Sequence, residues 1–214
     1  PMEIAPPRLP ADSAPDADPA LLVDAEEVCD AVFRGAGFSG VVREHLIVDQ
    51  CIFSGCRFSG AVLEQTRFSD VLFRNCDFSN AYLRGCSFQR VRFLDCKLTG
   101  AEFAGSVFGF VLFSRCRGEF AGFASGRFRR VMFGDCVLRS AVLSDCRFEQ
   151  SGFSGCDLSE AEFFGTRLLG ISLADCEIRG IRLSECLSFE LRGARISQGQ
   201  ALDLVRFLGV EFEE

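Results

Sequence analysis

The chain has 214 residues, a formal net charge of −7 at pH 7 and a hydrophobic content of 48%, which together favour a single elongated domain. No run of 18 apolar residues is present that could span a membrane. The only histidine, His45, has no second histidine or nucleophile placed near it, and phosphate loops, paired-carboxylate clefts and metal-ligand spacings are missing. We therefore expect no enzymatic activity, no cofactor and no metal.

The first 27 residues differ in composition from the rest of the chain. They are rich in Pro, Ala and Asp and carry no repeat, which is typical of a disordered segment. The stretch from Leu21 to Asp30 can form a short turn or helix over the domain that follows. Because the segment lacks a basic region followed by an apolar one, it does not look like a signal peptide, and we expect a cytoplasmic protein.

A five-residue period begins at Ala31 and continues to Cys186. Almost every fifth residue is Phe or Leu, and the residue two places before it is small. At steps of twenty, the small residues separate by type. One column is Cys56, Cys76, Cys96, Cys116, Cys136, Cys156 and Cys176; another is Ala61, Ala81, Ala101, Ala121, Ala141 and Ala161; a third is Val71, Val91, Val111 and Val131.

Such columns indicate a coil with four sides, each made of one pentapeptide. A short period repeated this often is typical of a solenoid, whose units bury their apolar faces by stacking on their neighbours. Successive coils would lie about 4.8 Å apart, the spacing of hydrogen-bonded strands. The pattern predicts an all-β solenoid of about eight coils over residues 28–196.

In these residues the chain resembles the pentapeptide-repeat family, whose motif is roughly Ala-(Asp/Asn)-(Leu/Phe)-x-x. The resemblance implies a right-handed quadrilateral β-helix. This chain has Cys and Phe where the family often has Ala and Leu, which is a variation in packing. Eleven of the twelve cysteines fall on inward small-residue positions, so we expect reduced core thiols rather than disulfides or metal ligands.

Residues 197–214 break the repeat. Ser197 has the properties of an N-cap, and Gln198 to Leu208 reads as a helix closed by Gly209. The helix is apolar on more than one face. It could plug the open end of the coil or join a second copy end to end, as in the gyrase-directed members of the family. The candidate dimer residues are Ala201, Leu202, Leu204, Val205, Phe207 and Leu208.

Charge is distributed unevenly along the repeat. Residues 30–130 carry a net charge of +5 and residues 131–196 a net charge of −3. Asp157 and Glu177 stand one coil apart on one side, where like charges repel unless a cationic group binds. The acidic residues of the C-terminal part are Asp135, Asp145, Asp157, Glu160, Glu162, Asp175, Glu177 and Glu185. They can serve solubility alone, or they can form a surface that binds a partner.

The unbroken coil, the apolar terminal helix and the acidic C-terminal half resemble the Qnr, MfpA and albicidin-resistance type of the family. This resemblance implies a homodimeric DNA mimic that binds DNA gyrase or topoisomerase IV and protects it from inhibitors, a form of antibiotic resistance. The basic N-terminal half fits whole-rod mimicry poorly. The alternative is a pentapeptide-repeat scaffold with an unknown partner.

Three further features leave alternatives open. Arg127, Arg129, Arg130, Arg147 and Arg167 form a basic strip on one side, but no aromatic residues interleave for base stacking, and we expect no direct binding of nucleic acid. Gly118 stands where a core Phe or Leu belongs, and Phe120 can either swing in to fill the gap or remain exposed. An outward apolar stripe at Ile52, Leu72, Leu112 and Met132 can face a partner or lie under the N-terminal segment.

Overall fold

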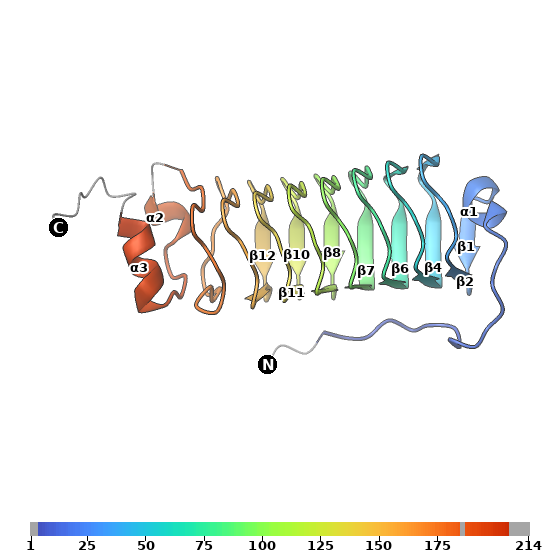
Figure 1. Ribbon diagram of the computed structural model, residues 1–214, viewed down its shortest axis with the longest axis horizontal. Helices are drawn as coiled ribbons and strands as arrows, with labels where there is room; N and C mark the ends of the chain where they lie inside the picture. The colour runs from blue at the N-terminus through green and yellow to red at the C-terminus, as the bar shows by residue number, and fades with distance from the viewer. Residues whose placement is uncertain (1–3, 185–186, 206–214) are drawn as a thin grey trace.

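A computed structural model describes residues 4–184 and 187–205, and these form a rod of stacked coils (Figure 1). The strands are β1 (Glu27–Cys29), β2 (Val32–Arg34), β3 (Val42–Glu44), β4 (Ile47–Ser54), β5 (Val62–Glu64), β6 (Arg67–Arg74), β7 (Ser87–Leu94), β8 (Val107–Gly109), β9 (Leu112–Ser114), β10 (Arg127–Arg129), β11 (Met132–Gly134), β12 (Arg147–Glu149) and β13 (Gly152–Ser154). Every pairing between them is parallel and joins residues twenty apart, as Phe68 with Phe88.

The predicted β-helix is therefore confirmed, with slightly fewer regular coils than the eight expected. One side carries a ladder of seven strands in the order β1-β4-β6-β7-β8-β10-β12, which corresponds to six turns from the first strand to the last. Beyond β13 the pairing continues only as isolated bridges, such as Glu162↔Arg182. The last coils are stacked like the others, but their sides are too short in extended backbone to count as strands.

From Asp30 to Gly180, every corner of the coil except Asp175 is a residue in the left-handed region of backbone space. Asn75 (φ 52°), Asn80 (φ 54°) and Gly85 (φ 63°) hold successive corners, and all three are residue types that tolerate this conformation. Among the corners held by other residue types are Phe110 (φ 57°) and Phe120 (φ 60°), where a bulky aromatic residue is strained.

The core is a set of aromatic stacks along the rod axis. The rings of Phe113 and Phe133 lie 4.6 Å apart with an interplanar angle of 3°, and both are fully buried. Each buried Phe contributes about 1.5–3 kcal/mol through burial. The cysteine column runs beside them, and the thiol of Cys116 lies 3.4 Å from the carbonyl oxygen of Phe93. All eleven cysteines in the described residues are free, and only Cys29 is exposed.

The N-terminal segment, for which composition predicts disorder, takes a defined course in the structure over residues 4–26. It runs back along the rod from the first coil (Figure 1) and includes the short helix α1 (Ala20–Asp24). Leu9 and Ala14 pack on a buried cluster of Val32, Ile52 and Leu72. The first half of the outward apolar stripe is thus covered by the chain itself.

Beyond that cover, the stripe remains partly open. Leu112 and Met132 keep intermediate exposure. Arg92, which interrupts the stripe, lies with its Nη2 atom 3.5 Å from the carbonyl oxygen of Ile4. The course of the N-terminal segment therefore accounts for Ile52 and Leu72 but not for Leu112 and Met132.

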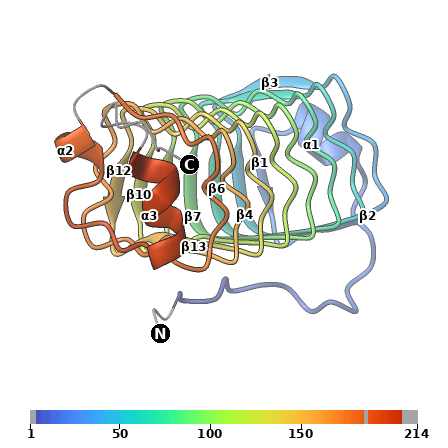
Figure 2. The same ribbon diagram turned by 60° about the vertical axis from the view of Figure 1, so that its left-hand side comes forward.

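The C-terminal end is covered by α2 (Leu187–Glu190) and α3 (Gln198–Val205) (Figure 2). Ser197 and Gln200 form a reciprocal capping box, because the Ser197 N–H donates to Gln200 Oε1 at 2.8 Å and the Gln200 N–H donates to Ser197 Oγ at 3.3 Å. Gln200 Nε2 also donates to the carbonyl oxygens of Leu173 and Cys176, at 2.7 and 2.6 Å. The helix therefore seals the open coil end.

The gap at Gly118 is not filled by Phe120, contrary to one of the two interpretations of the sequence. Phe120 is 64% exposed. A Cβ atom at Gly118 would lie 3.1 Å from Leu138 Cδ2, so the neighbouring coil already occupies the space. Because Leu138 fills the gap, Phe120 is left as an exposed aromatic side chain at a strained corner.

Candidate partner-binding face

One side of the solenoid gathers most of the predicted acidic residues, and we call it the Asp157 face. Its central column, formed by bridges between successive coils, is Gly37, Arg57, Asp77, Lys97, Arg117, Val137, Asp157 and Glu177. Asp157 and Glu177 are directly paired in this column. The structure thus confirms that these two carboxylates lie one coil apart on the same side.

The corners of the Asp157 face add three more carboxylates. Asp135 lies next to Gly155, where a Cβ atom would come within 2.6 Å of the Asp135 carboxylate. Asp175 accepts hydrogen bonds from the N–H of the same Gly155 at 3.2 Å and from Ser154 Oγ at 2.8 Å. Glu160 holds the opposite corner at φ 59°. Five of the eight predicted acidic residues therefore belong to one face.

Two arginines reduce the negative charge of this patch. Arg139 Nη2 lies 2.8 Å from Asp157 Oδ2, and Arg179 Nη2 lies 3.7 Å from Glu177 Oε2. Neither cation is buried, since their side chains are 57% and 77% exposed. Exposed ion pairs are weak and readily exchanged for other partners, so the carboxylates remain available to a cationic surface.

Hydrogen bonds keep two of these carboxylates ionised. Burial alone would raise the pKa of Asp157, but donors from Ser159 and Arg139 outweigh it and lower the pKa below its usual value. The hydrogen bond from Ser154 Oγ, opposed by burial, lowers the pKa of Asp175. Both groups therefore carry their charge throughout the neutral range.

The other three predicted acidic residues lie elsewhere. Glu162 belongs to the adjacent side, where it forms an ion pair with Arg182. Asp145 lines a hollow with Arg147 and Phe148, away from Asp157. Glu185 lies outside the described residues. The position of each acidic residue within the twenty-residue coil separates the five residues of the Asp157 face from the other three. Net charge along the chain does not distinguish them.

The N-terminal half of the same face has a different character. Its central column holds three cations and one carboxylate, in the order Arg57, Asp77, Lys97 and Arg117, and Lys97 Nζ lies 3.9 Å from Asp77 Oδ2. Charge on this face therefore changes from mixed and basic to acidic along the rod. The exposed Phe120 lies at its corner near this transition, a feature that the sequence left undecided.

Predicted dimer residues are only partly accessible. Leu202 of α3 is 63% exposed, whereas Ala201, Leu204 and Val205 have intermediate exposure. Leu204 packs against the core of the rod. Phe207 and Leu208 lie outside the described residues. Of the described part of α3, Leu202 is thus the apolar side chain most available to a second copy.

Metal and membrane features are not found within residues 4–184 and 187–205. No group of three or more His, Cys, Asp or Glu side chains in that part of the chain could hold a metal ion. The helices of the same part are too short and too polar to cross a bilayer.

One protein-family model matches the repeat region of the chain. The family model described as pentapeptide repeat region matches residues 28–103 and 86–163. No curated protein matches. Among solved structures, QnrB1, a plasmid-mediated fluoroquinolone resistance protein, is 24% identical with a TM-score of 0.42, and the match covers 88% of this chain and 90% of QnrB1.

A second solved structure is HetL from the cyanobacterium Nostoc, a pentapeptide repeat protein involved in heterocyst differentiation regulation. It is 16% identical with a TM-score of 0.33, and the match covers 81% of this chain and 90% of HetL. The family model spans more than half of the chain, in the same residues that form the stacked coils. The chain belongs to the pentapeptide repeat family.

Proposed function

We propose that this protein acts without catalysis, as a DNA mimic that binds a type II topoisomerase, DNA gyrase or topoisomerase IV, and protects it from inhibitors. The observation that carries the proposal is the Asp157 face. It presents Asp157 and Glu177 in direct register, with Asp135, Glu160 and Asp175 at its corners. An enzyme surface that binds DNA is rich in Lys and Arg, and it would meet these carboxylates in place of phosphates.

The resemblance of the sequence to the Qnr, MfpA and albicidin-resistance type supports the same proposal. The acidic part of the face is short, because the coils before Val137 carry Arg57, Lys97 and Arg117 in the same column. Mimicry is therefore confined to the C-terminal third. If two copies join through α3 with Leu202 at the contact, the two acidic parts become neighbours and form a longer acidic centre. A cytoplasmic location is expected, since the proposed partner acts there.

The test compares two aspartates that accept the same local hydrogen bonds. Asp157 accepts hydrogen bonds from the N–H and Oγ of Ser159, and Asp77 accepts the same two bonds from Ser79. Both lie in the central column of the same face, four coils apart. The substitution Asp157→Lys should abolish the effect on gyrase supercoiling and inhibitor-induced cleavage, while Asp77→Lys should retain it. Equal activity of the two variants would contradict the proposal.

A scaffold role remains the second candidate, and Phe120 favours it. The side chain is 64% exposed at a strained corner, a combination more common at functional positions than elsewhere. If the protein is a scaffold, an apolar contact at Phe120, and not the carboxylates, binds the partner. Phe120→Asn would then abolish partner binding, and Asp157→Lys would not.

A further inference from the structure

A second charged surface lies on the side of the rod formed by β8, β10 and β12, and its chemistry is opposite to that of the Asp157 face. Arg127 and Arg147 are paired residues of neighbouring strands, and Arg167 follows twenty residues later. We call these three residues the arginine column. Like charges placed directly opposite one another on adjacent strands repel, so this arrangement costs stability.

Several cations elsewhere on the rod are compensated. They pair with an acidic residue twenty positions earlier, on the preceding coil, in the ion pairs Arg84–Glu64, Arg90–Asp70, Lys97–Asp77, Arg115–Asp95 and Arg182–Glu162. In the arginine column the preceding residue is Val107 or another arginine. Within residues 4–184 and 187–205, none of its three members takes part in an ion pair. The arginine column therefore lacks the compensation that these five cations have.

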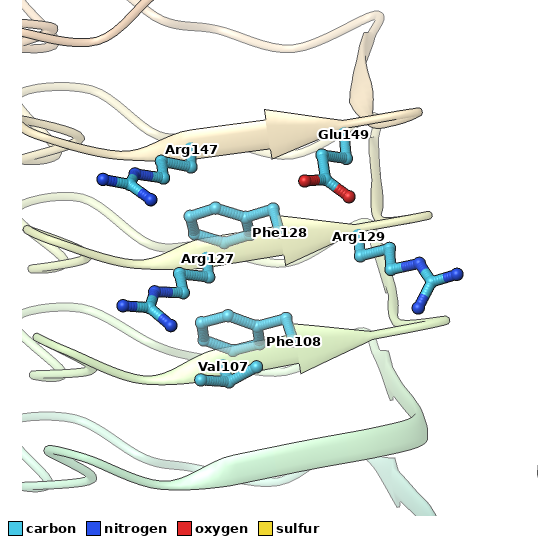
Figure 3. Close-up of a pocket in the computed structure, with 7 residues that line it drawn as sticks. All are labelled: Val107, Phe108, Arg127, Phe128, Arg129, Arg147 and Glu149. Atoms are coloured by element: carbon cyan, nitrogen blue, oxygen red, sulfur yellow. The ribbon is translucent and has the colours of Figure 1, made fainter.

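The arginine column borders two adjoining hollows. The first, of about 270 Å³, is lined by Arg127, Arg147 and the strands that carry the buried Phe108 and Phe128. Figure 3 shows the two arginine side chains extending in the same direction from neighbouring strands, with Phe128 drawn between them, Phe108 beyond Arg127 and Arg129 pointing away. Two guanidinium groups one coil apart can each bind an oxyanion of the same ligand.

The second hollow continues from the first and is larger, about 660 Å³. Arg147 and Glu149 line both hollows. The apolar part of the second is made by Phe148, Leu169 and Phe189, of which Leu169 is 71% exposed. Arg167 stacks on Phe189, with its guanidinium carbon 4.6 Å from the ring centroid. Exposed aromatic and aliphatic surface thus lies directly beside the basic groups.

We propose that the two hollows form one binding site for a small molecule that carries two or more phosphate groups on a flat aromatic body, as a nucleoside diphosphate does. The phosphates bind Arg127 and Arg147, and the aromatic body covers Phe148 and Leu169. Asp145 and Glu149, the carboxylates that line the second hollow, accept hydrogen bonds from hydroxyl or amino groups of the ligand.

The size of the site favours a small ligand over a nucleic acid strand. Its volume falls in the range of about 300–1,000 Å³ that is usual for small-molecule sites. The arginine column spans only two coil intervals, roughly 10 Å at the spacing of strands. The carboxylates of Asp145 and Glu149 would also repel a continuous phosphate backbone. A ligand that combines a few phosphates with neutral polar groups satisfies all of these groups together.

Calorimetric titration of the full chain tests the site. The probes are adenosine diphosphate, inorganic pyrophosphate and adenosine, which separate the contribution of the phosphates from that of the aromatic body. We expect adenosine diphosphate to bind most tightly, pyrophosphate more weakly and adenosine not measurably. Arg127→Gln and Arg147→Gln should each weaken binding by about tenfold or more, the loss expected for a charge-assisted contact.

The matched control is Arg57→Gln, because Arg57 is an exposed arginine in the central column of another face. It should leave binding unchanged, and thermal melts should show that none of the three variants is less stable than the unsubstituted protein. Absence of binding by adenosine diphosphate would overturn the proposal. So would equal weakening by Arg57→Gln, or tighter binding of a single-stranded oligonucleotide at the same ionic strength.

Discussion

Asp70 and Arg90 form a two-point ion pair between neighbouring coils, with Arg90 Nε 2.7 Å from Asp70 Oδ1 and Arg90 Nη2 2.6 Å from Oδ2. The same Asp70 carboxylate accepts the backbone N–H of Arg8 at 2.9 Å. Its side chain is only 5% exposed. One carboxylate therefore connects two coils of the rod to the N-terminal segment.

Replacing Asp70 tests that connection. Asp70→Asn keeps a residue that tolerates the left-handed corner but loses the charge, so we expect the free energy of unfolding to fall by about 1.5–3 kcal/mol, the range for hydrogen bonds to charged groups. The control is Asp95→Asn, because Asp95 binds Arg115 with the same two-point geometry at an exposed site. It should have a much smaller effect in chemical denaturation, and equal effects would contradict the role of burial.

The pH dependence of stability should reflect the same group. Burial opposes ionisation of Asp70, but the donors Arg90 and Arg8 outweigh it and lower its pKa in the folded protein. A lowered pKa stabilises the fold above the unfolded pKa of about 3.9, and that stabilisation is lost as pH falls through the folded pKa. Denaturation midpoints of the protein and of Asp70→Asn should therefore converge below about pH 4. A difference that stays constant as the pH falls further below that value would contradict the prediction.

The sequence predicts the coil well because each coil position repeats a chemical requirement. The Cys56 and Ala61 columns lie inside as expected, since only small side chains fit beside the stacked phenylalanine rings. Position within the same twenty-residue coil also assigns Asp157 and Asp145 to different places around the rod. Net charge along the chain cannot make this distinction.

The N-terminal segment could not be predicted in the same way. Its contacts at Asp70 and Arg92 join residues 62 and 88 positions apart. The five-residue period does not predict such contacts. The sequence also does not predict which side chain fills the space beside Gly118, because this depends on how far Leu138 extends from the next coil.

Phe120 offers a test of strain at the coil corners. Asn80 holds the equivalent corner two coils earlier at nearly the same φ. Phe120→Asn should therefore raise the free energy of unfolding by about 1 kcal/mol, because left-handed strain is relieved and little buried surface is lost. As a control, Phe123→Ala should lower it by about 3–5 kcal/mol, since Phe123 is fully buried. A loss of stability in Phe120→Asn would show that the ring makes contacts that outweigh the strain.

Thiol chemistry should report on the core. Burial, together with a hydrogen bond to Glu27, raises the pKa of Cys29 to about 11, and burial raises the pKa of Cys51 and Cys146 to about 12. In a Cys186→Ser variant, a chromogenic aromatic disulfide should modify one thiol in the native protein, with a rate that increases with pH up to about 11. Adding Cys29→Ser should abolish the reaction. Modification of several thiols without denaturant would mean that the coils open.

The terminal helix allows capping and dimerisation to be separated. Gln200 donates to two carbonyl groups of the last coils and is 91% buried, so Gln200→Ala should speed hydrogen exchange near Leu173 and Cys176 without changing the oligomeric state. Leu202 is 63% exposed, so Leu202→Glu should leave exchange unchanged and shift the mass measured by sedimentation equilibrium from dimer to monomer. If the unsubstituted protein is already monomeric, the helix serves only as a cap, and the acidic centre of a dimer is excluded.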